Sequence, residues 1–203
     1  MKDPQFTKSV IFLNALVPLA ILCWDAYAHQ LGANPTETAI HVTGMMALIF
    51  LLLSLTVTPL RKVTGYNQLS HYRRMLGLFA FFYGCIHLFT YLDFDRAFSL
   101  AGTIDDVLSK KFIFFGMLAL LLMVPLAATS TNGMIKRLGA AKWKRLHQLA
   151  YVAAMLGALH FWMSKKADKS LPWAFAIVLA ILLGYRVLAL VRNKKPHPIP
   201  ATR

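Results

Sequence analysis

Six long apolar runs, joined by short polar segments, occupy most of the chain. A helix needs about 20 apolar residues to cross a bilayer, so each run is long enough to form a membrane span. The pattern predicts a single domain, residues 1–203, folded as an all-α integral membrane bundle, and we detect no internal repeat. The six predicted transmembrane helices cover residues 10–27, 38–58, 75–92, 112–128, 146–163 and 171–190.

The segment before the first run, MKDPQFTKSV, has an acidic residue and a proline ahead of the apolar residues. No small-residue cleavage site follows at the spacing of a signal peptide. We therefore expect the first run to be a retained membrane span.

Composition agrees with a membrane protein. The chain is 58% hydrophobic and only 15% charged, which is too apolar for a soluble domain. Its net charge of +14 raises the alternative of nucleic-acid binding. The basic residues, however, lie between the apolar runs and form no continuous patch. We therefore expect membrane lipid as a partner, and no nucleic acid.

Lysine and arginine are distributed unequally over the connecting segments. If the N-terminus is cytoplasmic, fifteen of the 22 basic residues lie on the cytoplasmic side, six lie on the outer side, and Arg186 lies within the last run. Cytoplasmic loops of membrane proteins carry the excess of positive charge. The distribution therefore predicts that both termini are cytoplasmic.

Four of the seven histidines fall within predicted spans: His41 lies about one turn inside the second, and the other three, His87, His147 and His160, lie on the third and fifth. An ionisable side chain inside a membrane is costly and suggests a functional site. One such histidine could equally hydrogen-bond a neighbouring helix, but three on two helices favour a shared ligand. Imidazole is a common axial ligand of haem iron in helical bundles. His29 and His197 lie in connecting or terminal segments, where we expect them to be solvated.

The positions of these histidines along their spans predict two levels. His87 and His160 both lie near the outer end of a span that runs outward, so they could ligate one b-type haem together. His147 begins the fifth span and would lie roughly 20 Å below His160 on a straight helix. A second haem on His147 would complete a path for electrons across the membrane. On an ideal helix, however, these two side chains point about 140° apart.

The inner level has no obvious second histidine. The corresponding position on the third span, fourteen residues before His87, is Arg73. Arginine stays protonated and does not ligate iron, but it pairs well with the propionates of a haem. We therefore predict Arg73 as a cofactor-binding residue. His71 is an alternative ligand, although it lies on a different face of the helix.

Two segments carry a family resemblance. HYRRMLGLFAFFYGCIHLFTY and KWKRLHQLAYVAAMLGALHFW resemble the MsrQ (YedZ) family of the ferric-reductase-like transmembrane superfamily, and the likeness covers essentially the whole chain. Carried onto this sequence, the haem histidines of that family match His87, His147 and His160. The wider superfamily has a second histidine on the third span, and near Arg73 this chain departs from that pattern.

The resemblance implies a function. Members of the family are haem-containing subunits of the bacterial inner membrane. They pass electrons to MsrP, a periplasmic molybdopterin protein that repairs methionine sulfoxide in oxidised proteins. Their electrons are attributed to the quinone pool, with a cytosolic flavin reductase and FMN also implicated. We therefore expect one or two b-type haems, with FMN as a further candidate cofactor for the basic segment TSTNGMIKRLGAAKWKR.

Alternative functions stay open at this point. One is a metalloreductase that donates electrons to external ferric iron. Another is a haemless transporter or assembly factor whose histidines bind protons or a metal ion. The sequence lacks GxGxxG, CxxC and hydrolase motifs, so we predict an electron-transfer subunit with no catalytic residues of its own.

Overall fold

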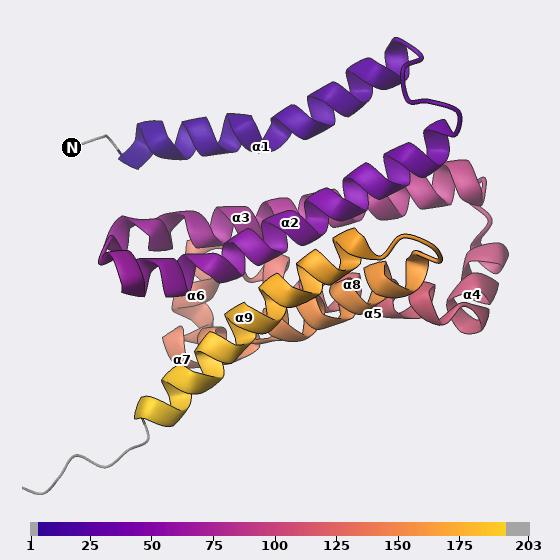
Figure 1. Ribbon diagram of the computed structural model, residues 1–203. Coiled ribbons are helices and arrows are strands. Elements are labelled where there is room, and N and C mark those ends of the chain that lie inside the picture. The colour runs from indigo at the N-terminus through magenta and orange to yellow at the C-terminus, as the bar shows by residue number, and fades with distance from the viewer. Residues whose placement is uncertain (1–3, 194–203) are drawn as a thin grey trace, which may run out of the picture.

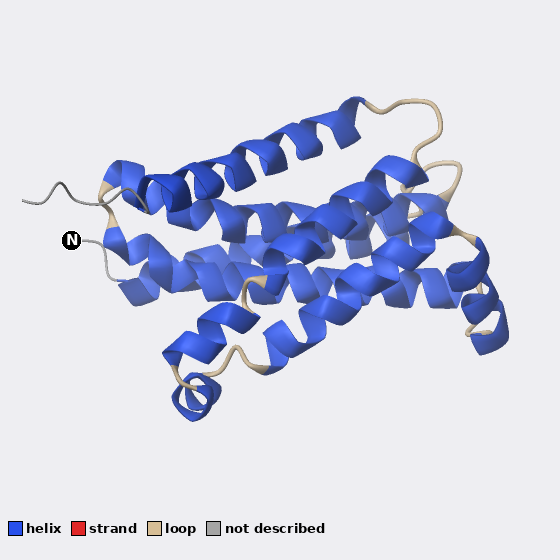
Figure 2. Cartoon of the chain, turned by 90° about the horizontal axis from the view of Figure 1, so that it is seen from below, coloured by secondary structure: helices blue, strands red, loops and turns tan. Residues whose placement is uncertain are grey.

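The computed structural model describes residues 4–193, and this part of the chain is helical without any strand (Figures 1 and 2). The all-α prediction is therefore confirmed. His197 and several basic residues that entered the charge distribution lie outside the described residues. The six long helices are α1 (Pro4–Tyr27), α2 (Pro35–Thr64), α3 (Ser70–Thr90), α5 (Lys111–Ala128), α8 (Leu149–Ser164) and α9 (Ser170–Asn193). The short elements are a 3-10 turn (Asn67–Leu69), a π-helical turn (Tyr91–Asp95), α4 (Leu100–Ser109), α6 (Asn132–Leu138) and α7 (Ala140–Leu146).

Within the described residues, five helical segments are long and apolar enough to cross a membrane. They are α1, α2, α3 with its flanking turns, α5 and α9. The other long helix, α8, has 16 residues and is about 24 Å long, which is less than the roughly 30 Å of a hydrocarbon core. The sixth span and the cytoplasmic placement of both termini stay predictions.

The helix predicted to begin at Leu146 is interrupted at His147 and Gln148, so its predicted start is wrong. The His147 amide donates to the Trp143 carbonyl as the last bond of α7, at 3.0 Å. The next turn is tight, because the Tyr151 amide donates to the Gln148 carbonyl three residues back. The distance and angle expected from a straight helix therefore do not apply to His147 and His160.

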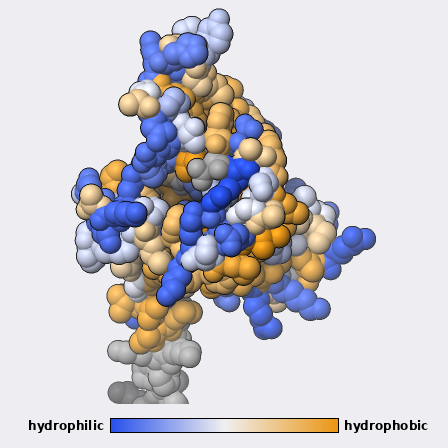
Figure 3. Space-filling view, turned by 90° about the vertical axis from the view of Figure 1, so that its right-hand side faces the viewer, coloured by the Kyte–Doolittle hydropathy of each residue, from blue (hydrophilic) through white to orange (hydrophobic). Residues whose placement is uncertain are grey.

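The long helices run alternately up and down the bundle, so that α1 begins and α9 ends at the same end (Figure 1). That end also carries α6 and α7, whereas α4 lies at the opposite end. The closest packing is between α2 and α3 and between α5 and α8. Figure 3 looks onto the α4 end, where hydrophilic residues gather while hydrophobic residues cover the flanks.

Polar contacts tie the outlying helices α1 and α9 to the bundle. The buried Tyr83 hydroxyl of α3 donates to the Ala15 carbonyl of α1 at 2.8 Å. On α9, Arg186 donates to the Leu55 carbonyl of α2 at 2.7 Å and lies over the Tyr151 ring of α8. The guanidinium of Arg186 is part-buried, and these contacts tie α9 to α2 and α8.

The helix α4 was not predicted from the sequence, and it is anchored by one buried carboxylate. Asp106 is 2% exposed and accepts hydrogen bonds from Tyr91, Arg96 and Lys110. The Ser99 side chain caps the first turn by accepting from the Gly102 amide. These contacts hold α4 across the end of the bundle where α3 and α5 meet.

We expect Asp106→Asn to destabilise the protein by about 1–3 kcal/mol, because the amide cannot replace a charged acceptor for its partners. Burial opposes ionisation, but hydrogen bonds from the three partners lower the pKa of the Asp106 carboxyl from 3.8 to about 2. The stabilisation is therefore present above pH 4 or so and is lost as the pH falls towards 2. Thermal unfolding in mild detergent at several pH values measures it, with exposed Asp105→Asn as the matched control. Equal stability of the two variants at neutral pH would contradict the anchoring role.

Candidate functional site

A cavity of about 640 Å³ lies inside the bundle, between α2, α3, α5 and α8. It reaches from apolar residues in the middle of the bundle, such as Leu51 and Met123, to polar residues at the α4 end, such as Glu37 and Lys110. This volume lies within the roughly 300–1,000 Å³ of small-molecule and cofactor sites. A mostly apolar cavity with a few convergent polar groups is the usual form of such a site.

Inside this cavity, His87 of α3 and His160 of α8 face each other. Their ring centroids are 6.0 Å apart and the rings are inclined at 79°. Two imidazoles bound to one metal ion through nitrogen, each at about 2.0–2.1 Å, would have centroids roughly 6.3 Å apart. The observed spacing therefore fits two imidazoles that would ligate one iron atom.

Hydrogen bonds fix which nitrogen of each ring is available. His87 Nδ1 lies 2.9 Å from the Ile40 carbonyl oxygen, and His160 Nδ1 lies 2.6 Å from the Phe112 carbonyl oxygen. A carbonyl only accepts, so each Nδ1 carries the proton and each Nε2 keeps its lone pair. Among the described residues neither Nε2 has a hydrogen-bond partner, which is the state required of an iron ligand. The residues present thus fit a haem held between α3 and α8.

The third predicted ligand, His147, lies away from this cavity, at the junction of α7 and α8. Its Nδ1 is 3.1 Å from the Trp143 carbonyl oxygen, and its ring stacks on the Trp143 indole with centroids 3.8 Å apart. Its Nε2 is buried and makes no hydrogen bond of normal distance and angle among the described residues, although the imidazole also lies near the Leu126 carbonyl of α5. Buried polar atoms without a partner are rare and often mark a ligand site.

Arg73 lies on α3 near His147, close enough to interact with it electrostatically. Its Nη1 lies 3.5 Å from the Thr58 hydroxyl, and the Arg73 guanidinium has no other side-chain hydrogen-bond partner in the described part of the chain. His71 is exposed at the start of α3. Neither residue lines the 640 Å³ cavity. The structure therefore brings two of the four predicted cofactor residues, His87 and His160, together in one cavity. The other two, Arg73 and His147, lie near each other at the α7 end of the bundle.

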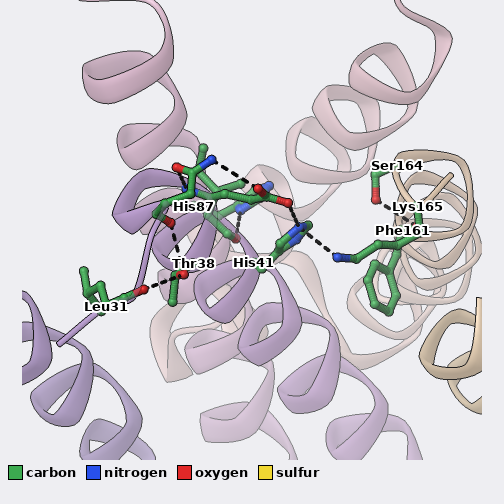
Figure 4. Close-up of polar contacts among 10 residues, drawn as sticks. Leu31, Thr38, His41, His87, Phe161, Ser164 and Lys165 are labelled. Carbon is green, nitrogen blue, oxygen red and sulfur yellow. Dashed lines mark hydrogen bonds and ion pairs between the residues drawn. The ribbon is translucent and has the colours of Figure 1, made fainter. Parts of the chain in front are cut away.

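Sequence reasoning missed a polar cluster at the mouth of the cavity (Figure 4). The Lys165 ammonium lies 2.9 Å from His41 Nε2, and the Glu37 carboxylate lies 3.3 Å from the same nitrogen. Glu37 and His41 are one helical turn apart on α2, which is the only signal of this cluster in the sequence. Lys165 brings positive charge to the mouth of a cavity that holds two imidazoles, and this charge suits the carboxylates of a haem.

Comparison with known proteins adds independent information. A protein-family model described as "Ferric reductase like transmembrane component" matches residues 43–158, which is more than half of the chain. The chain is similar to three proteins named "Protein-methionine-sulfoxide reductase heme-binding subunit MsrQ". The relative from Herminiimonas arsenicoxydans is 47% identical over 188 residues, covering 91% of this chain and 86% of the relative. The relative from Rhodospirillum rubrum is 44% identical over 202 residues, covering 99% and 97%. The relative from Deinococcus radiodurans is 44% identical over 186 residues, covering 92% of each chain.

Proposed function

The chain belongs to the MsrQ family of ferric reductase-like transmembrane proteins, and from this premise we propose that it is the haem-binding membrane subunit of a protein-methionine-sulfoxide reductase. In this proposal His87 and His160 ligate one b-type haem at the α4 end of the bundle. The observation that carries it is the pair of facing imidazoles, 6.0 Å apart, with both Nδ1 atoms hydrogen-bonded to helix carbonyls. Haem iron supplies reversible one-electron transfer when it is bound.

The residues around the site would bind the haem and shield it from water. The two imidazoles would hold the metal at a fixed depth. The apolar lining would exclude water and so limit the solvent reorganisation that each electron transfer requires. Lys165 at the mouth would pair with a haem carboxylate. His147 would hold a second haem at the level of α7 through its unpartnered Nε2, with Arg73 as a partner for the propionates of that haem.

Electrons would enter at the end that carries α6 and α7 and leave at the α4 end. The entry side carries a basic cluster that would bind the phosphate of a reduced flavin such as FMN: Lys136, Arg137, Lys142, Lys144 and Arg145. A quinol from the membrane is the other candidate electron donor. The exit side would face the periplasm of a bacterial inner membrane and dock a molybdopterin reductase of the MsrP type. Reducing a sulfoxide to a thioether takes up two electrons and two protons and releases one water. One-electron delivery must therefore occur twice in each turnover.

The proposal is tested on protein purified in mild detergent. We expect a b-type difference spectrum between the dithionite-reduced and oxidised states, with at least one haem per chain. The reduced protein should be reoxidised when the periplasmic reductase and a methionine sulfoxide substrate are added together, and not when methionine replaces the sulfoxide. Rapid reoxidation by ferric chelates without any protein partner would instead favour a metalloreductase. Absence of a Soret band would contradict haem binding and favour a transporter or assembly factor.

A further inference from the structure

The His87 ring packs against a backbone carbonyl and a glycine of α2, which together we call its seat. The ring donates to the carbonyl of Ile40, and the residue four positions later is Gly44. A Cβ atom placed on Gly44 would lie 2.9 Å from both Nδ1 and Cε1 of His87. These contacts are too short for real atoms, so this ring position is available only because residue 44 has no side chain.

The second ring is seated in the same way on a different helix. His160 donates to the carbonyl of Phe112 on α5, and the residue four positions later is Gly116. A Cβ atom on Gly116 would lie 2.7 Å from Nδ1 and 2.9 Å from Cε1 of His160. The approach is closer here, in line with the shorter hydrogen bond of 2.6 Å.

Helix geometry explains the four-residue spacing. Carbonyl groups of an α-helix point toward its C-terminus, and the carbonyl of residue i faces the amide of residue i+4. A side chain that donates to this carbonyl from outside the helix must therefore pass over residue i+4. Any side chain at that position occupies the space of the donor, and glycine leaves it open.

The two seats have the same arrangement, but each uses so few residues that the sequence shows no recognisable repeat. Each consists of a carbonyl acceptor and a glycine on the first helix of a packed pair, α2 or α5, and of a histidine donor on the second helix, α3 or α8. The histidine follows the accepting residue by 47 positions in one pair and 48 in the other. A further glycine, Gly84 or Gly157, stands three residues before the histidine in each case.

We propose that Gly44 and Gly116 are positioning residues that seat the two imidazoles with Nδ1–H bonded to a helix carbonyl, and that this seating sets the affinity and the reduction potential of the haem. The inference rests on the proposed function, because it requires that His87 and His160 ligate haem. A hydrogen bond from Nδ1 raises the basicity of the ligating nitrogen and favours the ferric state. Loss of the seat removes this bond and favours the ferrous state.

The test compares Gly44→Ala and Gly116→Ala with Gly184→Ala, a helical glycine of α9 that has no neighbouring atom within 4 Å of an added Cβ. Haem per chain, haem affinity and the midpoint potential are measured on each purified protein. We expect the midpoints of the first two variants to shift to more positive values and their haem affinity to fall roughly 10- to 100-fold. The shift should be larger for Gly116→Ala, and Gly184→Ala should match the wild type. A purely structural role would lower stability without moving the potential.

Unchanged midpoints and affinities in both seat variants, with haem present in the wild type, would overturn this inference alone. A wild type that binds no haem would overturn the proposed function itself. If a seat variant does not fold, His160→Gly protein is reconstituted with haem and either imidazole or 1-methylimidazole. Imidazole can still donate to the Phe112 carbonyl and should give the lower midpoint, whereas equal midpoints would contradict the role of the hydrogen bond.

Discussion

His87→Ala and His160→Ala are each expected to remove the same b-type haem and to abolish electron transfer through the protein. The two rings occupy opposite sides of one site, so loss of either leaves iron with a single protein ligand in a cavity shaped for two. Losing a ligand should reduce haem affinity by at least the roughly 10- to 100-fold found when an outer-sphere partner is removed. The measurement is the reduced-minus-oxidised spectrum together with haem per chain.

The matched control for these variants is His71→Ala, because His71 lies on α3 like His87 but is exposed at the start of the helix. This variant should keep the wild-type spectrum. If His87→Ala and His160→Ala lost different haem signals, the two rings would belong to separate sites. If both kept the full haem content, the paired imidazoles would be structural, held by their bonds to the Ile40 and Phe112 carbonyls.

Hydrophobic length and basic residues were sufficient to predict the long helices and their approximate ends. The prediction at α2 shows both the success and its limit: the apolar run over residues 38–58 is helical and Pro35 lies at the start of the helix. The predicted end before Pro59 is wrong, because the helix continues through this proline to Thr64 and ends at Gly65, which has a positive φ. Counting residues to the ends of their spans also predicted that His87 and His160 lie at a similar depth, as the structure places them. Both results depend on the regular rise of a helix, which a sequence encodes directly.

Features that depend on local tertiary contacts were not predictable in this way. The break after Leu146 arises where the His147 ring stacks on Trp143 and bonds to its carbonyl, and nothing in the apolar pattern marks it. The helix α4 depends on Asp106 meeting partners from three segments. The glycine seats were hidden for a similar reason, since Gly44 gains its meaning only from a ring that arrives 43 residues later.

The second large effect is expected at His147. His147→Ala should leave the haem between His87 and His160 in place and slow reduction of that haem by a quinol or reduced flavin at least about tenfold, since an inner ligand site would be lost. Any second haem should disappear from the spectrum, so that haem per chain falls towards one. Stopped-flow reduction and haem content measure the two effects on the same protein. Complete loss of all haem, equal to that of His87→Ala, would contradict separate inner and outer sites.

The thermal stability of a His147 variant tests the same residue independently, because its buried Nε2 has no hydrogen-bond partner among the described residues. His147→Leu removes this nitrogen, but it also removes the Nδ1 hydrogen bond and the stacking on Trp143, so a packing role alone predicts the same shift in unfolding temperature with and without haem. If His147 ligates a haem, His147→Leu should lower the unfolding temperature of the loaded protein by more than it changes that of the haem-free protein. Because only a ligand role makes the shift depend on haem, the difference between the two shifts decides between the roles.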